Sequence, residues 1–121
     1  MTGWEIFATD EFYAWADTLD EVSLRHLVQA IDQLAEVGPG LGRPLVDHIE
    51  GSQVHNMKEL RPGSSGRSEI RALFVFDPWR SAILLIGGDK SGNWSGWYRT
   101  AIPAAEQLYA RYLKDRQNEE A

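Results

Sequence analysis

The side chains that could carry out chemistry are concentrated in residues 54–103. This segment holds seven of the twelve Lys and Arg residues of the chain, namely Lys58, Arg61, Arg67, Arg71, Arg80, Lys90 and Arg99. Most of them fall inside or at the ends of predicted strands, where charged side chains are uncommon. Such a concentration indicates an anionic ligand or a charged partner.

The available groups suit cleavage of RNA without a metal ion. The chain has no cysteine and no Ser-His-Asp set, and its three histidines lie in different predicted elements. In metal-free cleavage a base takes the proton of a ribose 2′-hydroxyl, which attacks the adjacent phosphate, and an acid protonates the leaving 5′-oxygen. Arginines stabilise the phosphorane charge through planar, bidentate donors. Nearby aromatic rings can stack an unpaired base.

Charge is distributed unevenly along the 121 residues. The net charge is −6, yet residues 1–50 hold ten acidic residues and only two arginines, whereas residues 51–103 hold seven basic and four acidic residues. This distribution argues against coating nucleic acid by bulk charge but allows one basic patch. The N-terminus lacks the pattern of a signal peptide, and the longest apolar stretch, Ala82–Ile86, is too short to span a membrane. We therefore expect a cytoplasmic protein that uses no membrane and no cofactor.

The elements that must position these groups begin with a strand and two helices. Trp4–Ala8 is apolar and aromatic, which predicts a first strand. Thr9 or Asp10 can cap a helix after it, and Asp20 or Ser23 can cap a second helix. Apolar residues at helical spacing in both segments predict a helical hairpin.

The remaining segments predict a sheet and a last helix. We expect a loop over Gly38–Gly51, strands over Ser52–Arg61, Arg67–Asp77 and Ser81–Gly87, a turn loop over residues 62–66, a helix opened by Pro103, and a frayed polar tail over residues 114–121. The whole chain, residues 1–121, is predicted to be one domain of α+β class. Its helical hairpin and C-terminal helix pack on a twisted antiparallel sheet.

Strand alternation groups the polar side chains. If the loop between the first two strands of this sheet closes symmetrically, Arg61 lies opposite Arg67. One face then carries His55, Met57, Glu59, Arg61, Arg67, Glu69 and Arg71. Lys58 has the opposite parity. The arginines could also form only a cross-strand ladder with Glu59 and Glu69, worth roughly 0.2–1 kcal/mol a pair.

Four short motifs, in this order, resemble the RelE/ParE superfamily of toxins from type II toxin–antitoxin systems, and within it the phage-derived, HigB-like branch. They are KELR at residues 58–61, SEIRALF at 68–74, LLIGGDK at 84–90 and WYRTAIP at 97–103. The resemblance implies a compact α+β fold and a ribosome-dependent endoribonuclease that cuts mRNA in the A site. It also implies a helix-turn-helix antitoxin of the HigA type as partner.

The resemblance also suggests roles for individual residues. It implies that Arg61 and Arg71 bind the phosphate or its transition state, and that Lys90, Tyr98 and Arg99 supply further catalytic or RNA-contacting groups. We expect these residues and the basic and aromatic side chains around them to form one site, which has two sets of residues and no metal. The catalytic set is Arg71, Arg61, Lys90, Tyr98 and Arg99, and the RNA-binding set is Lys58, Arg67, His55 and Trp97.

Two other functions stay open at this point. The chain is acidic where RelE-type toxins are usually basic, and SGNWSGWYR, residues 91–99, stands where the family usually has a run of lysines. A ParE-like toxin that inhibits DNA gyrase by binding, without catalysis, is one alternative. A phage-derived adaptor without toxicity is the other.

Overall fold

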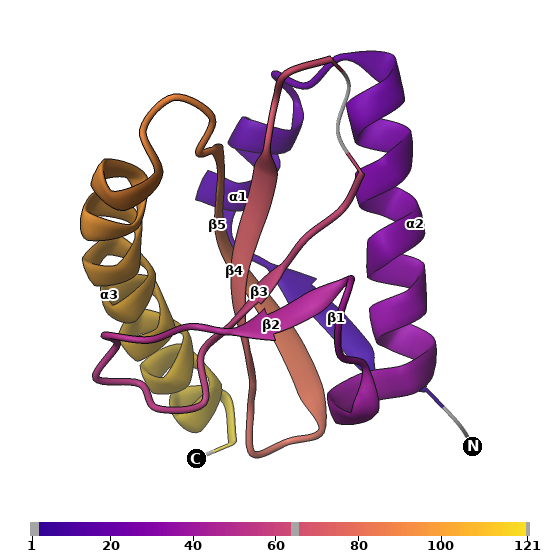
Figure 1. Cartoon of the computed structure of the whole chain (residues 1–121). Coiled ribbons are helices and arrows are strands. Elements are labelled where there is room, and N and C mark those ends of the chain that lie inside the picture. The colour runs from indigo at the N-terminus through magenta and orange to yellow at the C-terminus, as the bar shows by residue number, and fades with distance from the viewer. Residues whose placement is uncertain (1–2, 64–65, 121) are drawn as a thin grey trace.

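A computed structural model describes residues 3–63 and 66–120. These residues form three layers, with a sheet between helices (Figure 1). The middle layer is a five-stranded sheet in the order β1-β5-β4-β3-β2. Its strands are β1 (Glu5–Ala8), β2 (Val46–His48), β3 (Lys58–Leu60), β4 (Ile70–Phe76) and β5 (Ser81–Asp89). The helices are α1 (Asp10–Ala16), α2 (Glu21–Val37) and α3 (Trp94–Glu120), with a 3-10 turn, η1 (Gly38–Gly40), after α2. Figure 1 shows α1 and α2 on one side of the sheet and α3 on the other.

The predicted α+β class and the antiparallel meander of β3, β4 and β5 are confirmed. The sheet differs from the prediction at both edges. β1 pairs with β5 in parallel, so the sheet is mixed. β2 lies inside the segment predicted to be a loop and pairs with β3. Three residues are too few to show a strand pattern in the sequence.

The helical hairpin forms where its capping residues predict it. The Thr9 hydroxyl accepts a hydrogen bond from the Phe12 N–H at 3.0 Å, and the Asp20 carboxylate accepts one from the Ser23 N–H at 3.3 Å. Gly38 ends α2. The hairpin packs on one face of the sheet, and the two share a core made of Phe12, Leu27, Ala30, Leu34, Val46, Leu60, Ala72, Phe74, Ala82 and Leu84.

A second core lies between the other face of the sheet and α3. It contains Met57, Leu73, Val75, Ile83, Leu85, Ala101, Ala105, Leu108 and Tyr109. Burying one large apolar side chain is worth about 1.5–3 kcal/mol, so these contacts fix α3 on the sheet. Because helices cover both faces, β4 and β5 are apolar nearly throughout, as buried central strands are.

The last helix is longer than predicted at both ends. α3 begins at Trp94 and contains Pro103, which we expected to open it. Proline is common in a first helical turn, but the residues before Pro103 are helical as well, so Tyr98 lies inside the helix. Residues 114–120, expected to fray, continue α3. There the Arg116 guanidinium lies over the rings of Trp79 and Phe7, which helps to hold the helix end.

The register between β3 and β4 also differs from the prediction. Leu60 lies opposite Ala72, so Arg61 continues this alignment opposite Arg71 rather than Arg67. The shift is four residues. An even shift leaves every side chain on its predicted face, and Glu59 and Arg71 therefore share one side of the sheet as expected. Residues 64 and 65 of the predicted turn loop lie outside the described residues.

Across the described residues, no helix combines the length and apolarity that crossing a bilayer requires.

Candidate functional site

The carboxylate of Glu59 is the centre of a buried polar cluster on the α3 side of the sheet. Its side chain is only 8% exposed. The Tyr98 hydroxyl donates a 2.6 Å hydrogen bond to Oε2 of Glu59. The Nε atoms of Arg61 and Arg71 each lie 3.9 Å from Oε1 of the same carboxylate. One acid on β3 thus faces two arginines and a phenol from α3.

Arg71 has a donor that its surroundings leave unused. One of its terminal nitrogens, NH1, donates to the Ile70 carbonyl at 2.8 Å. Its Nε is buried and finds no hydrogen-bond acceptor among the described residues, although the Glu59 carboxylate lies at ion-pair distance. A buried donor without an acceptor costs about 1–3 kcal/mol. An anionic oxygen that reached this N–H would remove that cost.

Lys90 places a buried ammonium next to the cluster, at the end of β5. The residue is 4% exposed, and its Nζ lies 3.7 Å from the centre of the Trp94 ring and 5.4 Å from that of Tyr98. Burial, and then the charge of Arg71, lower the pKa of Lys90 below its ordinary value. The ammonium is therefore a stronger acid than a lysine in water.

Tyr98 is held as a neutral phenol. Burial raises its pKa well above the ordinary value, and the hydrogen bond to Glu59 raises it further. At neutral pH the hydroxyl can donate a hydrogen bond but does not act as a base. Its role in this arrangement is to hold the Glu59 carboxylate in place.

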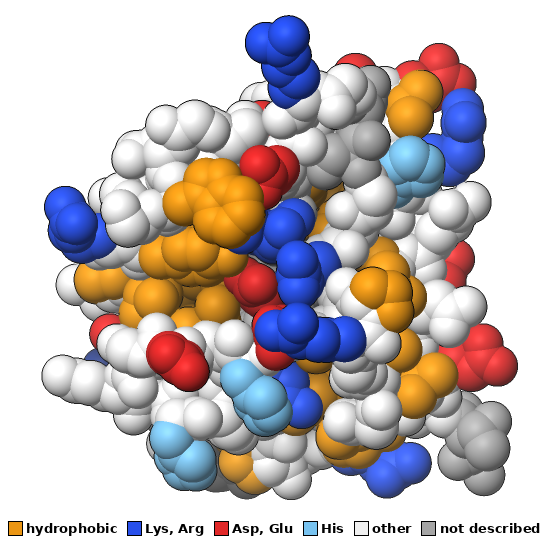
Figure 2. Space-filling model, viewed as in Figure 1, with side chains coloured by type: hydrophobic (Ala, Val, Ile, Leu, Met, Phe, Trp, Pro, Cys, Tyr) orange, Lys and Arg blue, Asp and Glu red, His pale blue; other side chains and the backbone are white. Residues whose placement is uncertain are grey.

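A line of alternating charges leads from this cluster to the surface. Arg61 lies 3.8 Å from Asp47 on β2, and Asp47 accepts a 2.7 Å hydrogen bond from Arg43. That hydrogen bond is the main reason why the pKa of Asp47 is lowered. Figure 2 shows the row of basic side chains over this part of the sheet, with acidic side chains between them. Sequence reasoning missed Asp47 and Arg43 because β2 was not predicted.

Gly88 makes room for an aromatic side chain beside the cluster. It lies opposite Arg71 in the sheet, and a Cβ added to it would come within 2.1 Å of the Trp97 indole nitrogen. Trp97 in turn meets Tyr98 edge to face, with ring centres 4.9 Å apart. Glycine at this position therefore allows α3 to approach β5 closely enough for Tyr98 to reach Glu59.

The structure brings together only some of the predicted site residues. Arg61, Arg71, Lys90 and Tyr98 meet around Glu59, and the half-buried Trp97 lies beside them. The other four lie elsewhere. His55 is exposed in the turn before β3, Arg67 is exposed before β4, Arg99 is exposed on α3, and Lys58 lies on the opposite face of the sheet with its Nζ 5.5 Å from the centre of the Phe76 ring.

Comparison with known proteins gives the family of this chain. Residues 14–110 match the family described as phage derived protein Gp49-like. HigB2 of Mycobacterium tuberculosis, designated a candidate toxin, is 52% identical over 100 residues, which are 83% of this chain and 50% of that protein. HigB3 of the same organism, also designated a candidate toxin, is 50% identical over 99 residues, or 82% and 84% of the two chains. The chain thus spans about half the length of HigB2.

Solved structures agree with this class at the level of the fold. A mutant of the Escherichia coli toxin RelE in the free state superposes with a TM-score of 0.60 over 91% of this chain and 98% of RelE, at 10% identity. A chain of the RelE–RelB complex from Pyrococcus horikoshii gives a TM-score of 0.54 over 77% of this chain and 99% of that chain, at 18% identity. The fold is that of a RelE-type toxin. The chain belongs to the Gp49-like family and is a relative of the two HigB proteins.

Proposed function

We propose that the protein is the toxin of a type II toxin–antitoxin pair, and that it cleaves mRNA in the ribosomal A site without a metal ion. Its family and its likeness to the two HigB proteins support the role of a toxin. The observation that carries the nuclease activity is the buried Nε donor of Arg71, which faces a cluster with two further cations, Arg61 and Lys90.

The proposed reaction uses the cations to bind the phosphate. The scissile phosphate approaches Arg71 and Arg61, whose guanidinium groups turn from Glu59 to the phosphate oxygens. Both arginines are 3.9 Å from Glu59, longer than a charge-assisted hydrogen bond, and the phosphate replaces the Glu59 counter-charge when they turn. The charge that develops on the phosphorane is then stabilised by both guanidinium groups, of which Arg71 is buried.

Lys90 is proposed as the acid of the reaction. The 2′-hydroxyl gives its proton to a water molecule as its oxygen attacks the phosphorus. The bond to the 5′-oxygen then breaks, which leaves a 2′,3′-cyclic phosphate, and the Lys90 ammonium protonates the 5′-oxygen. The lowered pKa of Lys90 favours this transfer. Glu59 and Tyr98 are positioning residues, because Tyr98 fixes the carboxylate that orients both arginines.

We further propose an antitoxin of the HigA type, with a helix-turn-helix domain, as the partner that silences the protein. The relative from Pyrococcus horikoshii was solved as a RelE–RelB complex. RNA should bind at the basic part of the sheet shown in Figure 2, because the first 50 residues are acidic and would repel its phosphates. The ribosome and its mRNA would meet the protein at that surface.

The test is primer extension on mRNA from cells that briefly express the protein or one of two variants. Arg71→Lys keeps a cation but not the bidentate donor. Arg25→Lys is the matched control, because Arg25 is exposed on α2, where it pairs with Glu21. We expect discrete cuts within translated codons with the parent and with Arg25→Lys, and none with Arg71→Lys.

Other outcomes would change the assignment. Intact mRNA in cells that stop growing would contradict the nuclease activity and favour a ParE-like inhibitor, which a gyrase supercoiling assay would then detect. Intact mRNA in cells that grow normally would contradict toxicity and favour an adaptor. Cuts that persist with Arg71→Lys would contradict a role of Arg71 in cleavage.

A further inference from the structure

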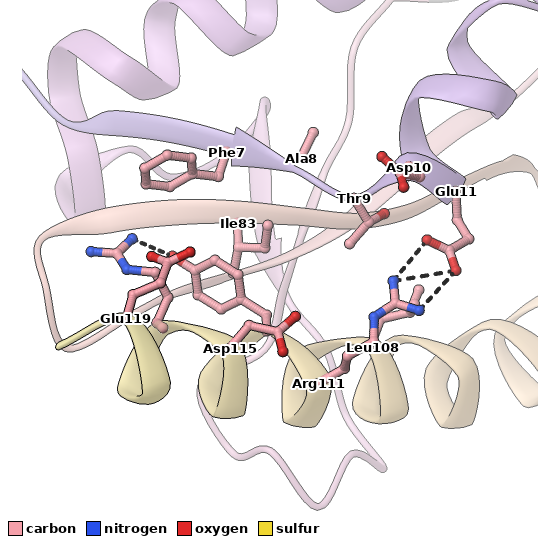
Figure 3. A pocket seen from close by; sticks show the side chains of 12 residues that line it. Phe7, Ala8, Thr9, Asp10, Glu11, Ile83, Leu108, Arg111, Asp115 and Glu119 are labelled. Atoms are coloured by element: carbon pink, nitrogen blue, oxygen red, sulfur yellow. Dashed lines mark hydrogen bonds and ion pairs between the residues drawn. The ribbon is translucent and has the colours of Figure 1, made fainter. Parts of the chain in front are cut away.

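A hollow lies on the flank of α3 that faces away from the Glu59 cluster. It is a groove of about 810 Å³ between β1, the start of α1 and the C-terminal half of α3 (Figure 3). The Glu59 cluster belongs to β3, β4 and the N-terminal half of α3, whereas this groove borders β1, the opposite edge strand of the sheet. The two sites are therefore separated by α3 and by β5.

The groove exists because one helix does not cover this face of the sheet. α3 packs on β5 and β4. A helix is about 10 Å wide and neighbouring strands are about 4.8 Å apart, so α3 covers roughly two strands. The strip over β1 is left open, and there Phe7, the register partner of Ile83, is 36% exposed. A second helix lying alongside α3 would fill this open strip.

The wall formed by α3 has the spacing of a helix–helix contact. It presents Leu108, Arg111, Tyr112, Asp115, Arg116 and Glu119, which are three or four residues apart along one side of the helix. Such a stripe is the surface that one helix offers to another packed along it. From Leu108 to Glu119 it measures roughly 16 Å, or three turns. The floor is apolar, with the exposed Phe7 ring beside the buried Ile83.

The charges of the groove are not balanced. Arg111 forms a 3.0 Å ion pair with Glu11 across the groove, and Arg116 lies 3.8 Å from the buried carboxylate of Asp77. Both arginines thus already face a carboxylate. Asp115 and Glu119 are exposed along the α3 wall, and Asp10 lies near Glu11 on the other wall (Figure 3). An occupant that complements the groove carries Lys or Arg.

We propose that this groove binds an amphipathic, basic helix of a protein partner, about three turns long. Its apolar side packs on the exposed Phe7 ring, which lies beside the buried Ile83 and Leu108, and its cations face Asp10, Asp115 and Glu119. The N-terminal half of the chain, with ten acidic residues and two arginines in residues 1–50, adds long-range attraction for such a partner. Because α3 separates the groove from the Glu59 cluster, the helix and RNA can bind at the same time. This site is independent of the proposed nuclease activity.

The probe is a fluorescein-labelled, end-capped 14-residue helix of Leu, Lys and Arg with one apolar side, titrated by fluorescence anisotropy. The variant is Asp115→Lys/Glu119→Lys. Its matched control is Asp32→Lys/Glu36→Lys, which changes two exposed acids on α2 by the same charge. We expect the groove variant to weaken binding at least about tenfold more than the control, and a peptide with Glu in place of Lys and Arg not to bind.

Amide chemical-shift mapping locates the bound peptide. Shifts are expected at Phe7, Leu108 and Asp115 and not at Glu59 or Arg71. Equal weakening by the two double variants would show attraction by bulk charge alone, and would overturn the proposal. So would absence of binding, or shifts centred on the Glu59 cluster. The groove variant should still cleave mRNA if the parent does, which keeps the two proposals separable.

Discussion

The phenol of Tyr98 donates a 2.6 Å hydrogen bond to the carboxylate of Glu59, and this contact joins α3 to β3 across 39 residues of sequence. The same carboxylate faces Arg61 and Arg71. The hydrogen bond therefore links α3 directly to the acid that orients both arginines.

Tyr98→Phe should lower the free energy of unfolding by about 1–3 kcal/mol, because a buried carboxylate loses a donor that water replaces poorly. Urea unfolding measures the change. Tyr13→Phe is the control, since Tyr13 is 59% exposed. Equal unfolding curves for the two variants would mean that the Tyr98 hydrogen bond adds no stability.

Stability should fall in alkaline solution as two tyrosines ionise. Burial, and then hydrogen bonds to Glu59 and Asp77, raise the pKa values of Tyr98 and Tyr112 above the ordinary 10.0. Because the pKa of each tyrosine is higher in the folded state than in the unfolded state, the protein has its full stability while the pH is below the unfolded-state pKa. That stability is lost as the pH rises above 10 toward the folded-state pKa. Melting temperatures between pH 8 and about 11 measure this loss. The double variant Tyr98→Phe/Tyr112→Phe should have a flatter profile, and an unchanged profile would contradict the assignment.

The sequence predicted the fold well wherever local signals decide structure. Thr9 and Asp20 cap the helices, and Gly38 ends α2, because these positions depend on side chains and backbone groups a few residues away. The predicted start of α3 at Pro103 was wrong for a related reason. Proline favours a first turn but does not exclude helix before it, and here the packing of Trp97 on Gly88 accompanies two earlier turns.

The site was less predictable than the fold. Strand parity placed Glu59 and Arg71 on one face even though the register was off by four residues. The bond from Tyr98 to Glu59 could not be foreseen, because it depends on α3 starting at Trp94 and on its approach to the sheet. Parity also separates Lys58 from this cluster, although Lys58 and Glu59 are neighbours in sequence.

Glu59→Gln should destabilise the protein by about 3 kcal/mol, because the buried Arg71 guanidinium loses its Glu59 counter-charge, whereas Arg61 keeps Asp47. Chemical denaturation measures the loss, with the exposed Glu36→Gln as control. The double variant Glu59→Gln/Arg71→Met should recover part of the stability, since it also removes a buried charge. A double variant less stable than the sum of the single variants would contradict this coupling.

Lys90→Met should separate activity from stability. The variant should reduce RNA cleavage about 10²–10⁴-fold, the usual contribution of a general acid. Its stability at neutral pH should equal or exceed that of the parent, because burial lowers the pKa of Lys90 and so disfavours its charged form. Because the pKa of Lys90 is lower in the folded state, the parent protein has its full stability only above the ordinary lysine pKa of 10.5. It loses stability as the pH falls through the folded-state pKa of Lys90. The advantage of the variant should therefore shrink as the pH approaches 10.5, and a less stable variant at neutral pH would contradict this account.

Gly88→Ala should test whether the close approach of α3 to β5 sets the geometry of the site. The new Cβ would lie 2.1 Å from the Trp97 indole nitrogen, so Trp97 must move, and Tyr98 beside it moves away from Glu59. Overpacking of this kind costs about 1–3 kcal/mol, and cleavage should fall with it. Gly42→Ala is the matched control, because an added Cβ there meets no atom within 4 Å. Thermal unfolding and cleavage are measured on both variants. If Gly88→Ala behaves like Gly42→Ala, the contact of Trp97 with β5 is not what holds Tyr98 against Glu59, and the position of α3 must depend on its second core alone.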